Sequence, residues 1–132
     1  MGIQLDMFDG TETRPIGSGE AIFAQGDEGG QMYVILEGIV ELRVGVAIVE
    51  VLGKGEPFGE LALLEQMPRM ATAIARTDCK LVPIPRDVFL ALVQEHPTFA
   101  LDIMRVMAER LRRMDARTLG IPVAPRPAPQ ER

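Results

Sequence analysis

Cysteine and histidine are nearly absent from this chain, which holds one of each among its 132 residues. A lone thiol, Cys79, can form neither an internal disulfide nor a metal cluster. Metal-dependent enzymes with β-barrel folds use several histidines as ligands, and His96 is the only one available. We therefore expect Cys79 to serve packing, and we expect no metal site and no catalytic histidine.

Long apolar stretches are also missing. No run of roughly 18 uninterrupted apolar residues occurs, and the first residues lack the apolar segment of a signal peptide. The sequence therefore predicts no membrane span and a cytoplasmic chain. Its net charge of −5 opposes non-specific binding to nucleic acid, although residues 97–132 carry seven basic residues against four acidic ones.

Runs of β-branched and aliphatic residues, broken by glycine, fill the first two thirds of the chain. This pattern is typical of short antiparallel strands. After an N-terminal arm at residues 1–14, we expect a mainly β fold with flanking helices, built on a double-stranded, jelly-roll-like β-roll over residues 15–85. The strands are expected within Pro15–Gln25, Met32–Glu37, Ile39–Val44, Val46–Leu52, Ala71–Arg76 and Cys79–Pro85.

Two C-terminal helices are expected after the roll, within residues 86–119. The first, Arg86 to Glu95, carries apolar side chains on one face and ends at a proline. The second, Pro97 to Leu119, has a longer apolar stripe that either packs on the roll or forms a lid or a dimer seam. Residues 121–132 contain four prolines, so we expect a disordered tail instead of a helix-turn-helix, and no direct DNA binding.

The stretch from Phe58 to Thr72 combines a glycine-led helical turn with a carboxylate and an arginine. Gly59 allows close backbone approach, and the amides that open a short helix at Glu60 form an anion-binding end. The guanidinium of Arg69 suits two phosphate oxygens, whereas the carboxylate of Glu60 is repelled by phosphate and suits a sugar hydroxyl. These residues predict a site for a cyclic sugar phosphate.

Residues 58–73, FGELALLEQMPRMATA, closely resemble the phosphate-binding cassette of the cyclic nucleotide-binding domain family. Upstream, Gly26 to Gly38 is similar to the glycine-turned hairpin of that family. The resemblance implies a cyclic nucleotide-binding domain over residues 15–120. Two interpretations of the glycines at 26, 29 and 30 stay open, a plain hairpin turn or direct contact with a ligand.

The resemblance also implies a role for each cassette residue. The phosphate is expected to contact Arg69, the backbone amides of Gly59, Leu61 and Ala62, and the neighbouring Met70, while Glu60 binds the ribose 2′-hydroxyl. Because the thioether of Met70 is a weak acceptor and no donor, it serves the guanine amino group poorly. The expected ligand is therefore cAMP, with cGMP second.

The purine base has no evident partner in the roll, and leaving it exposed would waste apolar burial. We therefore expect the last helix to act as a lid. Its candidate residues are Met107, Leu111 and Met114, with Arg110 and Arg113 as donors to the base edge.

The expected function is a regulatory module that senses a cyclic nucleotide, is not an enzyme and needs no cofactor. Its signal would pass through movement of the C-terminal helix to an unknown effector protein, or to self-association. The alternative is a non-sensing interaction or dimerisation module of the same fold, in which Glu60 and Arg69 form an ion pair without ligand.

Overall fold

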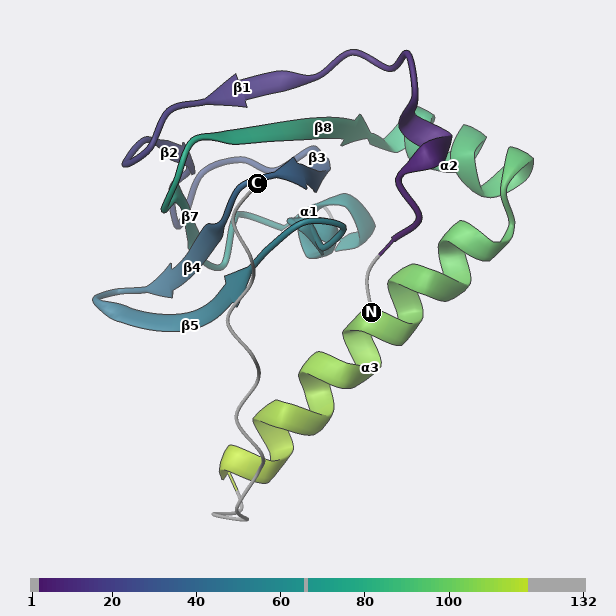
Figure 1. Cartoon of the computed structure of the whole chain (residues 1–132). Coiled ribbons are helices and arrows are strands. Elements are labelled where there is room, and N and C mark those ends of the chain that lie inside the picture. Colours follow the sequence, from purple (N-terminus) through teal and green to yellow (C-terminus); the bar gives the residue numbers. More distant parts are fainter. Residues whose placement is uncertain (1–2, 66, 119–132) are drawn as a thin grey trace.

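The computed structural model describes residues 3–65 and 67–118, and it contains two four-stranded antiparallel sheets that face each other (Figure 1). The first sheet has the order β1 (Arg14–Ile16), β8 (Cys79–Pro85), β3 (Gln31–Glu37), β6 (Pro57–Phe58). The second has the order β2 (Ala21–Phe23), β7 (Thr72–Ala75), β4 (Val40–Val44), β5 (Ala47–Leu52). The predicted mainly β fold, a β-roll with helices after it, is confirmed.

The helices are η1 (Asp6–Phe8), α1 (Glu60–Glu65), α2 (Arg86–Glu95) and α3 (Thr98–Thr118). The last two follow the roll and agree with the predicted bounds to within a residue. Among the helices of the described residues, not one combines the length and the apolar character needed to cross a bilayer. The expected tail at residues 121–132 lies outside the described residues.

The runs that become β3, β4 and β5 follow one another along the chain, but they are divided between the two sheets. β4 pairs with β5, whereas β3 pairs with β8 and β6. The chain changes sheet at Gly38, whose φ of 98° favours glycine. A side chain there would also collide with the backbone of Asp78 and Cys79. A single glycine between two strand runs can therefore mark a change of sheet, as Gly38 does, or a hairpin, as Gly45 does between β4 and β5.

Two apolar clusters hold the fold together. The first lies between the sheets and takes residues from all eight strands. The second lies on the other face of the first sheet, where Met32 and Val34 of β3 contact Phe99 and Ile103 of α3. Because β3 is covered on both faces, Met32 to Ile35 are buried without alternation. The same sheet therefore supports both the pocket side and the helices.

The N-terminal arm contains the short helix η1 and is anchored to the rest of the fold. Ile3 and Phe8 are buried in the second cluster, and the ring of Phe8 meets that of Phe99 edge-on with centroids 6.3 Å apart. The backbone N–H of Ile3 donates to Gly55 O at 2.6 Å. The arm thus contributes to the packing of α3 on the first sheet.

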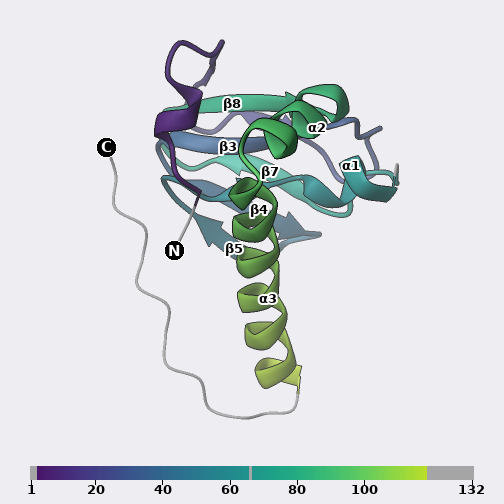
Figure 2. The ribbon, with the colours of Figure 1, turned by 90° about the vertical axis from the view of Figure 1, so that its right-hand side faces the viewer.

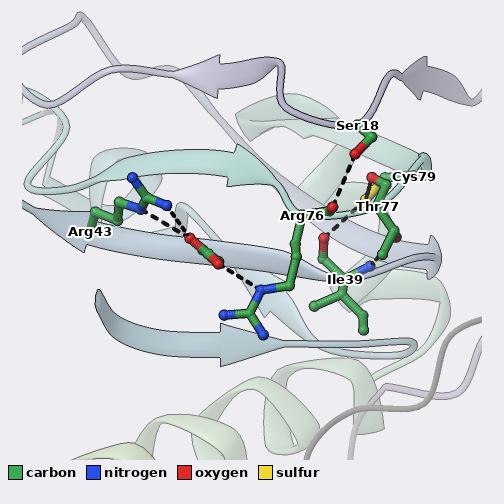
Figure 3. Close-up of polar contacts among 7 residues, drawn as sticks. Ser18, Ile39, Arg43, Arg76, Thr77 and Cys79 are labelled. Carbon is green, nitrogen blue, oxygen red and sulfur yellow. Dashed lines mark hydrogen bonds and ion pairs between the residues drawn. The ribbon is translucent and has the colours of Figure 1, made fainter. Parts of the chain in front are cut away.

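Glu41 is a buried carboxylate on the second sheet, held by two arginines. Arg43 donates to its Oε2 through Nε and Nη2 at 2.9 and 2.7 Å, and Arg76 Nε donates to its Oε1 at 2.6 Å. Figure 3 shows the two arginines reaching this carboxylate from opposite sides. The Arg43 hydrogen bonds, with those of Arg76, hold the pKa of Glu41 below its ordinary value.

Cys79 is buried, and its thiol contacts Ile39 O at 3.4 Å, in keeping with a packing role.

Candidate functional site

A pocket opens beside α1, against β2 and β4 of the second sheet. It is lined by Phe23, Leu42, Gly59, Glu60, Leu61, Ala62, Pro68, Arg69, Met70 and Ala71. All six cassette residues that the sequence assigned to phosphate and ribose therefore meet in one place. The walls are mostly aliphatic and aromatic, with one carboxylate and one guanidinium among them.

Gly59 is the residue that lets Arg69 enter the pocket. Its φ of 81° favours glycine, and a Cβ built on it would lie 2.7 Å from Arg69 Nη1. Arg69 Nη1 donates to Gly59 O at 3.1 Å, and Nη2 donates to Gln31 O at 2.7 Å. The two carbonyl groups, from β3 and from the turn before α1, fix the orientation of the guanidinium.

Arg69 is a buried cation. Its exposed fraction is 6%, and no ion pair to it occurs within the described residues, where its Nε also has no hydrogen-bond partner. The guanidinium carbon lies 4.0 Å from the centroid of the Phe23 ring. Burial lowers the pKa of Arg69, against the opposing effect of Tyr33, Asp27 and Glu60. An arginine remains protonated under such conditions, so its charge is available to a ligand.

Glu60 is 7% exposed and is contacted by α3. Arg110 Nη1 lies 3.4 Å from Glu60 Oε1, and Arg110 Nη2 donates to Pro57 O at 2.6 Å. The other carboxylate oxygen, Oε2, is buried and has no hydrogen-bond partner among the described residues. Burial raises the pKa of Glu60, and the charge of Arg110 partly offsets this rise. The carboxylate therefore has one engaged oxygen and one that can still accept a hydrogen bond.

The five lid candidates on α3 are not gathered at the pocket. Arg110 reaches Glu60, and Arg113 Nη2 pairs with Glu50 Oε1 of β5 at 2.9 Å. Met107 packs in the second cluster, while Leu111 and Met114 are 60% and 55% exposed. The C-terminal half of α3 runs beyond the strands of the second sheet (Figure 2). The two arginines thus contact acidic residues of the roll, and the three apolar candidates line no part of the pocket.

The loop at Gly26 to Gly30 supports the cassette from outside the pocket. The backbone N–H of Gly26 donates to Arg69 O, and the N–H of Arg69 donates to Asp27 O, both at 2.8 Å. A Cβ at Gly29 would collide with Ala62 of α1. None of these loop residues lines the pocket, so in this structure Gly26 serves turn geometry, with a φ of 90°, and Gly29 serves close packing.

Nothing in the sequence indicated that Phe23 and Glu50 belong to the site or contact its residues. Phe23 follows the buried Ile22, and strict alternation would turn its side chain away from the interior. A register shift between Ala21 and Phe23 lets both Ile22 and Phe23 pack against the inner cluster. Glu50, the partner of Arg113, likewise lies in a strand whose pairing the sequence does not specify.

Chemically, the arrangement suits binding. Arg69, Glu60 and Arg110 together carry one net positive charge, in a pocket whose other walls are largely apolar. No group of three or more side chains that could hold a metal ion occurs within the described residues. The geometry fits an anion with a neighbouring hydroxyl and an apolar part.

Comparisons with known proteins point to the same kind of site. A family model described as cyclic nucleotide-binding domain matches residues 13–96. The chain is 38% identical over 102 residues to the cyclic AMP receptor protein of Thermus thermophilus, covering 74% of this chain and 47% of that protein. It is 37% identical over 102 residues to lysophospholipase NTE1 of Chaetomium globosum, covering 74% of this chain and 7% of that protein. The crystal structure of the Thermus thermophilus Catabolite Activator Protein matches with a TM-score of 0.72 and 34% identity, over 81% of this chain and 53% of that one. The chain thus spans about half of two of these relatives and a small part of the third.

Proposed function

This chain belongs to the cyclic nucleotide-binding domain family, and we propose that it is a regulatory module that binds cAMP beside α1 and passes the signal on through α3. The proposed role is binding, not catalysis. The observation that carries the proposal is Arg69, a buried cation that has no ion pair within the described residues. A cation in that position is costly unless an anion accompanies it in the functional state.

The charge of the pocket favours a cyclic phosphodiester. After Glu60 and Arg110 offset each other, the single charge of Arg69 is left, and it matches the single negative charge of a cyclic phosphate. An open 5′-monophosphate carries about −1.5 to −2 at neutral pH, so it would leave surplus negative charge beside Glu60. Backbone amides at Gly59, Leu61 and Ala62 would complete the anion site.

Glu60 supplies the ribose contact in this proposal. Its Oε2 is a buried acceptor without a partner among the described residues, so a 2′-hydroxyl could donate to it. The purine would then lie against Leu42, Leu61 and Met70, which are apolar or only weakly polar. A surface of this kind offers little to the amino group of guanine, and this supports cAMP over cGMP. The similarity to a protein named cyclic AMP receptor supports the same choice.

The link to α3 is the contact between Arg110 and Glu60. The carboxylate of Glu60 also pairs with Arg110. A ligand hydroxyl that donates to this carboxylate would therefore change its contact with Arg110, and with it the position of α3 on the roll. Leu111 and Met114 are exposed on α3, and Leu61 and Met70 are exposed at the pocket. A shift of α3 that brings these pairs together would cover the base and bury all four. The downstream effector protein, or self-association, remains a prediction, as does a cytoplasmic location.

Titration calorimetry with cAMP and the Arg69→Ala variant tests the proposal. Loss of a charge-assisted contact in a shielded pocket costs about 2–4 kcal/mol, so affinity should fall roughly 30- to 1,000-fold. Glu60→Gln should lose about tenfold, because the amide can still accept one hydrogen bond. Arg105→Ala is the control, since Arg105 is exposed and pairs with Asp102 on its own helix. Wild-type affinity in Arg69→Ala would refute the site.

A non-sensing interaction module is the alternative, and the exposed apolar residues of α3 favour it: Leu101, Met104, Leu111 and Met114. Its expected ion pair between Glu60 and Arg69 is not what the structure shows, because Glu60 pairs with Arg110. A fluorescent cyclic nucleotide separates the two functions. The alternative predicts no binding at micromolar concentration, together with concentration-dependent self-association or capture of a protein partner.

A further inference from the structure

Three aromatic rings next to Arg69 form a cluster that connects the two sheets. Phe23 comes from β2, while Tyr33 and Phe58 come from β3 and β6 of the other sheet. Ring centroids lie 6.1 Å apart for Phe23 and Tyr33, 5.9 Å for Phe23 and Phe58, and 5.3 Å for Tyr33 and Phe58. Each ring is therefore held by the other two. Phe23 has a fixed position at the wall of the pocket that it lines.

The face of Phe23 lies against Arg69. The guanidinium carbon is 4.0 Å from the ring centroid, within the range in which the quadrupole of the ring attracts a cation. This attraction is larger at desolvated sites, and Arg69 is buried. The ring thus stabilises this charge by direct contact, together with the carbonyl oxygens of Gly59 and Gln31, while Asp27 and Glu60 act on it without forming an ion pair within the described residues.

An aromatic ring and a carboxylate stabilise a buried guanidinium in different ways. A carboxylate accepts the N–H donors and cancels the charge, so an incoming phosphate would compete with it. A ring face attracts the cation but does not take up the donors at its edge. Of the five N–H donors of Arg69, the two carbonyl groups engage one each, and Nε has no partner among the described residues. Donors therefore remain for a ligand.

We propose that Phe23 is a positioning residue for Arg69: its ring holds the guanidinium at the pocket without neutralising it. The charge and the remaining N–H groups then stay available for the anionic group of the ligand, a singly charged phosphodiester. The identity of that anion rests on the proposed function, whereas the geometry belongs to the protein without ligand. Phe23 acts through Arg69, so its replacement weakens binding while the pocket keeps its other residues.

Two variants and one control test this role in the full chain. Phe23→Leu keeps an apolar side chain but removes the ring, and Phe23→Tyr keeps the ring. Phe89→Leu removes a half-buried ring from the second cluster, away from the pocket, and controls for general loss of packing. Calorimetry with cAMP should show a loss of about 2- to 30-fold for Phe23→Leu. Phe23→Tyr should stay within about twofold of the wild type, and Phe89→Leu should bind as the wild type does.

The position of Arg69 can be read without ligand by NMR. A proton above an aromatic face resonates at unusually low frequency, so the Arg69 Nε–H and Cδ–H signals, assigned by their absence in Arg69→Ala, should be shifted upfield. The shift should persist in Phe23→Tyr and disappear in Phe23→Leu. A Phe23→Leu protein with unchanged Arg69 signals overturns the proposal. So does one whose signals move while cAMP affinity stays at the wild-type value. If the wild type binds no cAMP, the proposed function fails, and the NMR comparison still decides whether Phe23 positions Arg69.

Discussion

Glu60 and Glu41 are both buried carboxylates, and burial affects them in opposite ways at the scale of the single residue. Two arginines donate directly to Glu41 and lower its pKa. Glu60 has one arginine at 3.4 Å, and burial outweighs that contact and raises its pKa. Glu41 is therefore a stabilising ion-pair centre, whereas the ionised form of Glu60 costs the protein stability. A buried carboxylate whose pKa is raised in this way is typical of binding sites.

Substitution to glutamine should separate the two carboxylates by pH. Above the ordinary glutamate value of 4.5, the unfolded chain ionises Glu60 before the folded chain does, so the wild type loses stability as pH rises through the folded pKa. Glu60→Gln has no carboxyl group to ionise at this position. The unfolding free energy of the variant, relative to that of the wild type, should therefore increase between pH 4 and pH 7. Urea unfolding at several pH values measures the difference.

Glu41→Gln is the matched comparison, with the opposite sign. The stability from Glu41 is present above pH 4.5 and lost as pH falls through its lowered folded pKa. The variant should lose about 2 kcal/mol at pH 7, and less at lower pH. Parallel pH profiles for the two variants would contradict at least one of the two assigned pKa directions.

Gly59→Ala should be more damaging than a glycine replacement elsewhere with the same backbone conformation. Gly10 has a φ of 77°, close to the 81° of Gly59, but a Cβ on Gly10 meets nothing within 4 Å. Gly10→Ala should cost only the strain of the left-handed conformation, about 1–2 kcal/mol. Gly59→Ala adds the collision with Arg69 and should also weaken cAMP binding. Equal stability and equal binding in the two variants would show that Arg69 moves away from the new methyl group without cost.

At the scale of the element, α3 is held in two different ways along its length. Its first half is packed by Phe99, Ile103 and Val106, which are buried. Its second half contacts the roll through Arg110 and Arg113, which pair with Glu60 and Glu50. The apolar contacts of the first half lie outside the pocket, whereas the contact of Arg110 with Glu60 involves a residue that lines it. We therefore expect a ligand to shift the second half of α3 and to leave the first half in place.

Hydrogen exchange in α3 tests this division. Arg110→Ala should speed exchange of the amides in residues 107–114 without ligand, and leave residues 99–106 slow. Saturating cAMP should slow exchange in residues 104–117 of the wild type, because the lid closes over the base. Arg105→Ala is the control for loss of an arginine from the same helix.

The lid also predicts an effect on affinity. Replacing Leu111 and Met114 together by alanine should weaken cAMP binding, while Arg69→Ala in that background still reduces it further. If ligand leaves exchange in this segment unchanged and the double variant binds normally, α3 is a packing element only.

At the scale of the whole molecule, the first sheet separates the pocket from the second cluster, to which the N-terminal arm belongs. Phe8 is 4% exposed and lies in that cluster against Phe99. Phe8→Ala should therefore cost about 3–5 kcal/mol of stability, and Phe8→Leu less than about 1.5 kcal/mol. Affinity for cAMP should be unchanged wherever the variant is folded. A large loss of affinity in folded Phe8→Leu would show that the two clusters are coupled.

The sequence by itself determined those features that depend on neighbours along the chain. Periodicity and turn chemistry act over a few residues. They predict the strands, the two C-terminal helices and the cassette with Gly59, Glu60 and Arg69. The structure brings the cassette residues into one pocket. The sheet to which each strand belongs depends on residues far apart in the sequence, so the sequence did not show that β3 and β4 lie in different sheets.

Only the tertiary structure decided which side chains meet across the fold. Arg110 reaches Glu60 across 50 positions and Arg113 reaches Glu50 across 63, and no local pattern encodes such pairs. Phe23 turns inward because a register shift in the pairing of β2 breaks the alternation that a sequence pattern assumes. The arm is anchored because Ile3 and Phe8 find an apolar surface made by distant elements. The sequence thus predicts the ligand-binding groups, whereas long-range packing decides what orients Arg69 and what couples Glu60 to α3.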